Sequence, residues 1–174
     1  MSPKQLLQGK WLGHPLHPAL VHVPAGLWPA ALMFDLVSRA ADGGNNAAVR
    51  LAFWCACVGL AGALIAIPAG LADWWEIKKG KPGHRLGAWH MALNLAATAA
   101  MATSAALRLG QGLSAPVVAT APLLLCAAGN ALVLVSGYLG GRMVFEHGAS
   151  VARFSKKRWR ATAEEGHAHL PEEK

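Results

Sequence analysis

Four long apolar stretches dominate the chain, and its charged residues fall almost entirely between them. Uncharged runs cover residues 51–72, 86–107 and 109–141, and a similar run at about 18–38 carries only Asp35 near its far end. Each run reaches the roughly 20 residues that a helix needs to cross about 30 Å of hydrocarbon. The pattern predicts an all-α protein, an integral membrane four-helix bundle with helices at about 18–38, 51–73, 85–107 and 115–141.

The composition leaves no room for a soluble domain beside these helices. Of the 174 residues, 54% are hydrophobic and only 14% are charged, which is too apolar for an ordinary soluble domain. We therefore expect an interfacial lead-in at residues 1–17, a membrane domain at 18–143, and a cytoplasmic tail at 144–174 that is first basic and then disordered. The opening residues have no apolar core or cleavage site typical of an export signal.

Basic residues predict the orientation of the helices. With four crossings, both termini and the loop between the second and third helices lie on one side of the membrane. Of the 16 basic residues, only Arg39, Arg50 and Arg108 then lie on the other side. Because basic residues accumulate on the cytoplasmic side, both termini are predicted to be cytoplasmic. The net charge of +7 is explained by orientation and anionic lipid, and it does not indicate a nucleic-acid partner.

Two helices carry patterns typical of interior faces. The predicted second helix has small residues at Gly59, Gly62, Ala66 and Gly70, spaced by three and four, which lets neighbouring helix backbones approach closely. The predicted third helix has polar residues at four-residue steps, namely His90, Asn94 and Thr98. Polar side chains within a membrane helix face the protein interior, so this line should point into the bundle.

The first helix is preceded by the run His14-Pro-Leu-His-Pro-Ala-Leu-Val-His22. A residue before proline is disfavoured in the helical region, so we expect His14 and His17 to be extended at the membrane surface. Only His22 then enters the helix, where Pro24 and Pro29 remove backbone hydrogen bonds. Counting from the same membrane face, His22 and His90 lie at matching depth, which a shared ligand requires.

This first motif, with Leu139-Gly-Gly-Arg-Met-Val-Phe-Glu-His-Gly148 after the last span, resembles the bacterial membrane family catalogued as domain of unknown function 2231. The resemblance covers about residues 13–151. It implies a four-helix domain in the bacterial inner (cytoplasmic) membrane, with histidines near one membrane face, and it supplies no established reaction. This chain has Met143-Val-Phe145 where the family pattern leads us to expect Leu-Val-Tyr, which argues against a catalytic tyrosine there.

The leading functional hypothesis is a b-type haem held between His22 and His90, with Gly26 and Gly87 one turn away to admit the macrocycle. Such a protein would transfer electrons to or from a quinone or a redox protein, and it could act as a homo-oligomer. It would be a redox carrier or binding subunit rather than a hydrolase, because no Ser/His/Asp arrangement lies at a suitable depth.

Two alternatives stay open from the sequence. One is a non-haem site for zinc, copper or iron, because imidazoles and carboxylates are ligands for these metals; its candidate ligands are His14, His17, His22, His90, Asp73, Glu146 and His147. The other is a structural or assembly subunit without a cofactor, in which the histidines bond to carbonyls freed by the prolines.

Overall fold

The computed structural model describes residues 1–149 and residue 165, and the described chain is built from helices. Their order is α1 (Pro3–Leu7), the 3-10 helix η1 (Lys10–Leu12), α2 (Leu16–Leu20), α3 (His22–Ala40), α4 (Asn46–Trp74), α5 (Pro82–Gln111) and α6 (Thr120–Phe145). The expected basic segment at 153–160 and most of the expected tail lie outside the described residues.

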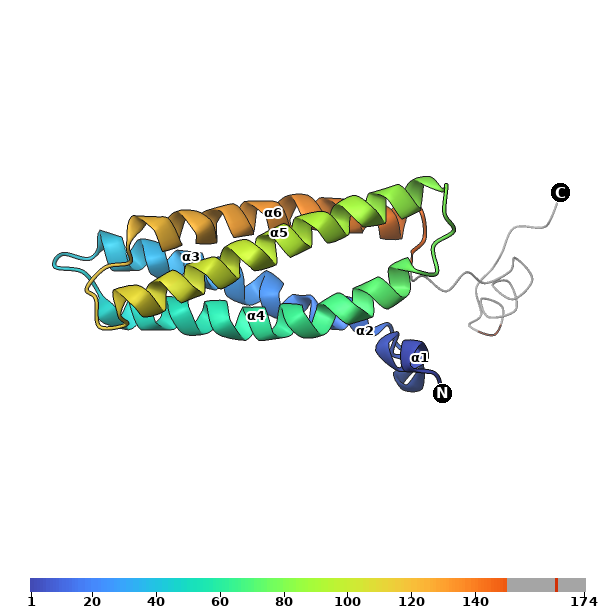
Figure 1. The fold of residues 1–174 in the computed structure, drawn as a ribbon, viewed down its shortest axis with the longest axis horizontal. Coiled ribbons are helices and arrows are strands. Elements are labelled where there is room, and N and C mark those ends of the chain that lie inside the picture. Colours follow the sequence, from blue (N-terminus) through green and yellow to red (C-terminus); the bar gives the residue numbers. More distant parts are fainter. Residues whose placement is uncertain (150–164, 166–174) are drawn as a thin grey trace.

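The four long helices, α3 to α6, run side by side (Figure 1). Each packs against two of the others, in the cyclic order α3, α4, α5, α6. The N-terminus and the connection 75–81 lie at one end, which we call the histidine end; the connections 41–45 and 112–119 lie at the other, the far end. The N-terminal α1 sits beside the C-terminal end of α4.

The buried face of helix α3 follows from a heptad-like pattern in the sequence. Its buried residues are Pro24, Trp28, Ala31, Asp35 and Ser38, at steps of four and three that place them on one face. A charged residue therefore belongs to the same stripe as the core tryptophan. The stripe determines which way the helix is turned, and it points Asp35 inward.

The first predicted helix is divided into α2 and α3 at Val21. The expectation that His17 is extended is wrong, because His17 lies in the first turn of α2. The following Pro18 is also in that turn, where a missing amide hydrogen costs no intrahelical bond. Pro24 is likewise in the first turn of α3, so only Pro29 interrupts hydrogen bonding within the helix.

The small residues of α4 accommodate α2 and α3, as their spacing predicts. A β-carbon at Gly59 would lie 2.4 Å from the Trp28 indole nitrogen, and one at Gly62 would lie 2.6 Å from Val23. Both distances are too short for real contacts, so these positions require glycine. The close approach of the helices is thus encoded by α4, while α3 supplies the bulky side chains.

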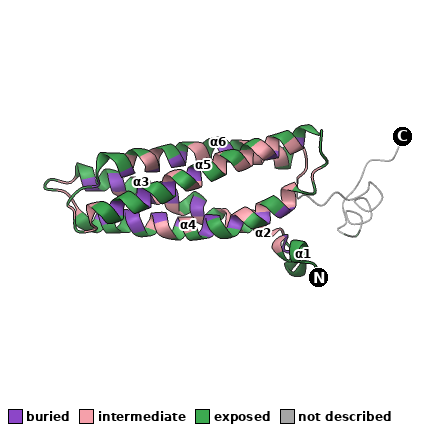
Figure 2. Ribbon diagram, viewed as in Figure 1, coloured by how far each residue is buried: buried purple, intermediate pink, exposed green. Residues whose placement is uncertain are grey.

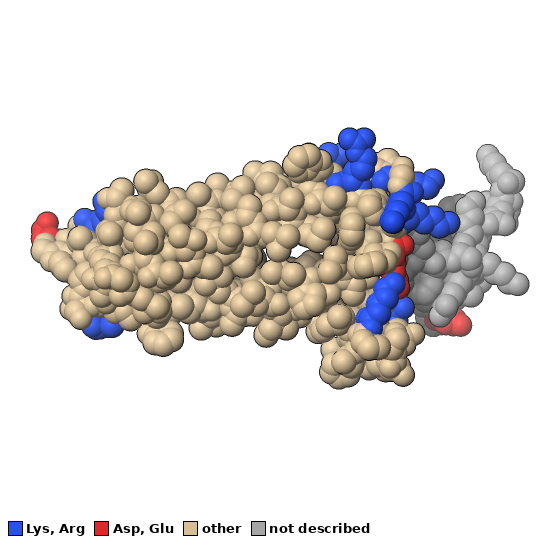
Figure 3. All heavy atoms as spheres, in the orientation of Figure 1, with Lys and Arg blue, Asp and Glu red and all other residues tan. Residues whose placement is uncertain are grey.

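Exposed residues occur along the whole length of the long helices (Figure 2), and many of them are large and apolar. Exposed residues include Trp54, Leu64, Leu124 and Leu134, the last with 76% of its surface accessible. Figure 3 shows the charged side chains gathered at the two ends, with a band of uncharged residues between them. A surface of this kind matches a lipid environment, where exposed hydrocarbon is not a liability.

By length and composition, three stretches of the described chain could cross a membrane: Leu16–Ala40, Asn46–Trp74 and Thr120–Phe145. Helix α5 is as long as the others but is not among them, because polar residues such as His90, Asn94 and Arg108 dilute its apolar character. The prediction of a fourth crossing therefore depends on how α5 is packed rather than on its hydropathy.

Candidate functional site

A cavity of about 940 Å³ lies between the helices towards the histidine end. Its walls are mostly apolar, and all five helices from α2 to α6 contribute to them. An opening among uncharged side chains is visible on one face of the molecule (Figure 3). The polar side chains that line it are His17, His90, Asn94 and Thr98, together with Asp73, Glu76, Lys78, Lys81, Glu146 and His147. A volume this large is at the upper end for a small-molecule site.

His17 reaches this cavity from α2 and is held against α4. Its Nδ1 lies 3.0 Å from the carbonyl oxygen of Ala66. The ring fits there only because residue 70 is glycine, since a β-carbon at Gly70 would lie 2.7 Å from the ring carbon Cε1. Gly70, the last of the small residues on this face of α4, thus makes room for the His17 imidazole.

His90 is held in the same way between α5 and α6. Its Nδ1 lies 2.8 Å from the carbonyl oxygen of Ser136, and its Nε2 lies 3.1 Å from the side-chain nitrogen of Asn94. A β-carbon at Gly140 would lie 3.1 Å from the His90 ring. Asn94 also donates to the Ser136 hydroxyl, so the predicted polar line of α5 does face the interior.

These contacts assign the ring hydrogens of both histidines. A backbone carbonyl can only accept a hydrogen bond, so Nδ1 must carry the hydrogen in both His17 and His90. Each Nε2 is then unprotonated and carries one lone pair, and in His90 this lone pair accepts from Asn94. Donation of Nδ1–H to a carbonyl with Nε2 left as the electron donor is the usual state of a metal-ligating histidine.

The two imidazoles are close neighbours across the cavity. Their ring centroids are 6.3 Å apart and their planes are nearly perpendicular, at 86°. His17 and His90 belong to helices separated by more than 60 residues of sequence. The structure thus assembles a pair of histidines with unprotonated Nε2 atoms, of which that of His90 accepts from Asn94.

The pair that depth alone predicted is not the pair in the structure. His22 is exposed, does not line the cavity, and places its Nδ1 3.3 Å from the carbonyl of Ala19. Gly26 faces open space, and Gly87 makes room for Trp74 and Met143 rather than for a ligand beside His90. The partner of His90 is His17, and the glycines that admit the rings are Gly70 and Gly140.

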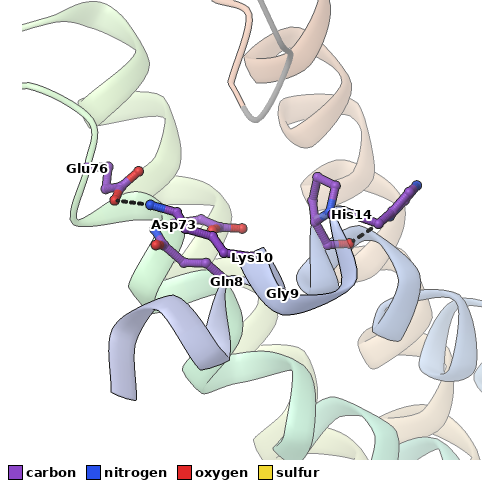
Figure 4. Close-up of a pocket in the computed structure, with 8 residues that line it drawn as sticks. Gln8, Gly9, Lys10, His14, Asp73 and Glu76 are labelled. Carbon is purple, nitrogen blue, oxygen red and sulfur yellow. Dashed lines mark hydrogen bonds and ion pairs between the residues drawn. The ribbon is translucent and has the colours of Figure 1, made fainter. Parts of the chain in front are cut away.

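The proposed non-haem ligands do not assemble either. Among the described residues no group of three or more His, Cys, Asp or Glu side chains could hold a metal ion. His14 is exposed and turned away from Asp73 (Figure 4). Glu146 is paired with Arg142, and this hydrogen bond lowers the pKa of the Glu146 carboxyl. His147 packs over Gly83.

The far end contains an ion pair that sequence reasoning missed. Asp35 and Arg108 form a bidentate pair in which both side chains have no accessible surface. Ser104 also contacts the guanidinium, and Ser38 caps the backbone carbonyl of Asp35. The available signal was that opposite charges occur near the same end of two helices that run in the same direction.

Helical stretches of spanning length, an apolar outer surface and polar groups gathered inside define an integral membrane protein in contact with the lipid bilayer. The chain belongs to the family described as "Predicted membrane protein (DUF2231)", which matches residues 13–153. No curated protein and no solved structure matches the chain.

Proposed function

We propose that this protein is a membrane redox subunit that holds a b-type haem between His17 and His90. The observation that supports this most strongly is the number of available ligands. The cavity offers two neighbouring imidazoles with unprotonated Nε2 atoms, and among the described residues no group of three or more His, Cys, Asp or Glu side chains could hold a metal ion. A haem supplies its own four equatorial nitrogens and needs only two axial ligands, whereas a structural zinc site takes four protein ligands and a catalytic one three.

The separation of the two rings leaves them close enough to serve one bound group. Their centroids are 6.3 Å apart, and His17 and His90 would be the residues that hold a haem, which would supply electron transfer when bound. The cavity of about 940 Å³ supplies the space beside the rings. Binding requires Asn94 to give up its contact with His90 Nε2, and it retains the Ser136 hydroxyl as a partner.

The visible spectrum of the purified protein tests this proposal. In detergent with dithionite we expect a Soret band with sharp α and β bands, lost in both His17→Ala and His90→Ala. His22→Ala is the matched control, because His22 lies outside the cavity, and it should keep the full spectrum. Loss of the bands in His22→Ala but not in His17→Ala would contradict the ligand assignment. A colourless protein with stoichiometric metal would instead favour a non-haem site.

A structural role is the second candidate, and the bond between Asn94 and His90 supports it. In this arrangement both nitrogens of the His90 ring are occupied, and the ring joins α5 to α6 through Ser136. The outcome that identifies this role is a purified protein without haem or metal whose His90→Ala variant loses stability by about 1–3 kcal/mol.

We also propose that α5 crosses the bilayer with the other three helices, in the bacterial inner membrane, with both termini in the cytoplasm. Helix α5 packs between α4 and α6 and spans the same length (Figure 1), so its polar face is shielded from lipid. Of the basic residues in the sequence, only Arg39, Arg50 and Arg108 lie next to the connections of the far end. This distribution fits the positive-inside rule.

Reporter fusions measure this orientation. A green fluorescent protein joined after residue 149 should fluoresce, because it folds in the cytoplasm, and alkaline phosphatase inserted at residue 43 should be active, because it folds outside. The same phosphatase inserted at residue 80 serves as the matched control and should be inactive. The reverse pattern of activities at 43 and 80 would contradict the proposed orientation.

A further inference from the structure

A second, smaller pocket of about 340 Å³ lies where the N-terminal segment meets the end of α4. It adjoins the cavity of the histidine pair, with which it shares Asp73 and Glu76, and is lined by Gln8, Gly9, Lys10, Gly13, His14, Pro15, Asp73 and Glu76. Figure 4 shows the Gln8, Lys10, Asp73 and Glu76 side chains together on one side of it. Nothing in the redox proposal uses this pocket.

Two hydrogen-bond acceptors in the pocket have no donor. Gln8 has only 7% of its surface accessible, and its Oε1 is buried without a partner. The orphan cannot be removed by turning the amide round, because Gln8 Nε2 donates to the carbonyl of Ala72 at the end of α4. The Asp73 carboxylate forms no hydrogen bond or ion pair with any described residue. Buried polar atoms are nearly always paired, so the unpaired Gln8 Oε1 indicates an absent donor. The Asp73 carboxylate beside it is half-buried.

The neighbouring lysines do not fill this need. Lys4 and Lys10 both pair with Glu76, at 3.3 and 3.6 Å. The pKa of the Glu76 carboxyl is lowered by the Gln8 side chain and by these two lysines, which is consistent with Glu76 being their shared counter-ion. Lys10 also acts electrostatically on Asp73, but it forms its ion pair with Glu76. Asp73 has no ion pair of its own, so a positively charged group with several N–H donors would complement it.

The surroundings of the pocket identify a lipid as the source of that group. Leu6, Trp11 and Leu12 of the N-terminal segment expose more than half of their surface. Tryptophan with exposed leucines beside a helix end is typical of the headgroup level of a bilayer. The pocket lies next to the end of α4, at the level where the ammonium groups of zwitterionic phospholipid headgroups are found.

We infer that this pocket binds the headgroup of a phospholipid that carries a primary ammonium, such as phosphatidylethanolamine. The ammonium donates to Asp73 and to Gln8 Oε1, and the lipid phosphate lies towards Lys10, which has three donors and a single long contact to Glu76. The acyl chains lie along the exposed Trp11 and Leu12. A choline headgroup has no N–H to donate.

Native mass spectrometry of the full chain tests this inference. After exchange into detergent with equimolar phosphatidylethanolamine and phosphatidylcholine, the wild type should retain the ethanolamine lipid over the choline lipid by about tenfold, the scale of a charge-assisted hydrogen bond. Asp73→Asn should reduce this preference to about equal retention. Asp42→Asn, at an exposed acid of the far end, is the matched control and should keep the preference.

Two further measurements test the inference without relying on Asp73→Asn. Gln8→Met removes the orphan acceptor at nearly constant size and should weaken the preference even if Asp73→Asn does not fold. Millimolar free ethanolamine should not displace the lipid. Equal retention of both lipids by the wild type, an unchanged preference in Gln8→Met, or displacement by free ethanolamine would each overturn the inference. The readout is lipid mass, so it is independent of whether haem is bound.

Discussion

Replacing Asp35 by leucine is expected to lower the free energy of unfolding by about 3 kcal/mol or more. The substitution leaves the Arg108 guanidinium buried, 1% accessible, with only the Ser104 hydroxyl as a polar contact. Breaking a buried ion pair on one side typically costs 3–5 kcal/mol because an uncompensated charge remains. Arg108→Met should be similarly costly, because it leaves the Asp35 carboxylate buried without its partner.

The double variant Asp35→Leu/Arg108→Met distinguishes the loss of the whole ion pair from the loss of one partner. Apolar replacement of both partners is often neutral or stabilising, so the double variant should lose about 1 kcal/mol or less. Asp42→Leu and Arg50→Met are matched controls at exposed positions of the same end, and each should change stability by less than about 0.5 kcal/mol.

Equilibrium unfolding in mixed micelles of a mild detergent and sodium dodecyl sulfate measures all five variants. Strong coupling between Asp35 and Arg108 is the expected result of the cycle. Two single variants that each lose less than about 0.5 kcal/mol would show that the pair contributes nothing to holding the far end together.

Gly70→Ala is expected to displace the His17 imidazole and disrupt the histidine pair. The added methyl group would lie 2.7 Å from the ring, so the ring must leave its hydrogen bond to the Ala66 carbonyl. Forcing extra volume into a packed interior costs about 1–3 kcal/mol. The nitrogen chemical shifts of His17 in an NMR spectrum should report the loss of the Nδ1 hydrogen bond, and any haem spectrum should be lost.

Gly26→Ala is the matched control for this substitution. Gly26 also lies within a long helix, but a β-carbon there has no neighbour within 4 Å. Because alanine is the better helix former, this variant should be neutral or gain up to about 1 kcal/mol. Equal behaviour of the two variants would mean that Gly70 has no particular role beside His17.

The sequence predicted the helical membrane class, the family and two of the interior faces. Small residues at Gly59 and Gly62 pack against α3, and the line from His90 to Thr98 faces the cavity. These predictions worked because each concerns one helix, and the period of 3.6 residues defines which side chains share a face. The fourth crossing is different, because the composition of α5 by itself does not require it.

The depth of a residue along one helix could not show whether His17 or His22 faces His90. On a continuous helix, residues five apart point about 140° apart, so His17 and His22 cannot both face His90. The helix is also interrupted at Val21, and α2 takes its own direction against α4. The buried stripe from Pro24 to Ser38 excludes His22, and this stripe could have been read from the sequence.

What the sequence determined by itself is therefore the set of helices, their apolar lengths and the faces that must be buried. The tertiary structure decided which faces meet: His17 with His90, Gly70 and Gly140 with those rings, and Asp35 with Arg108. The physical reason is that hydrophobic periodicity fixes rotation about one helix axis only. Contacts between helices depend on how each helix is turned and offset against its neighbours, and close packing of particular side chains sets that.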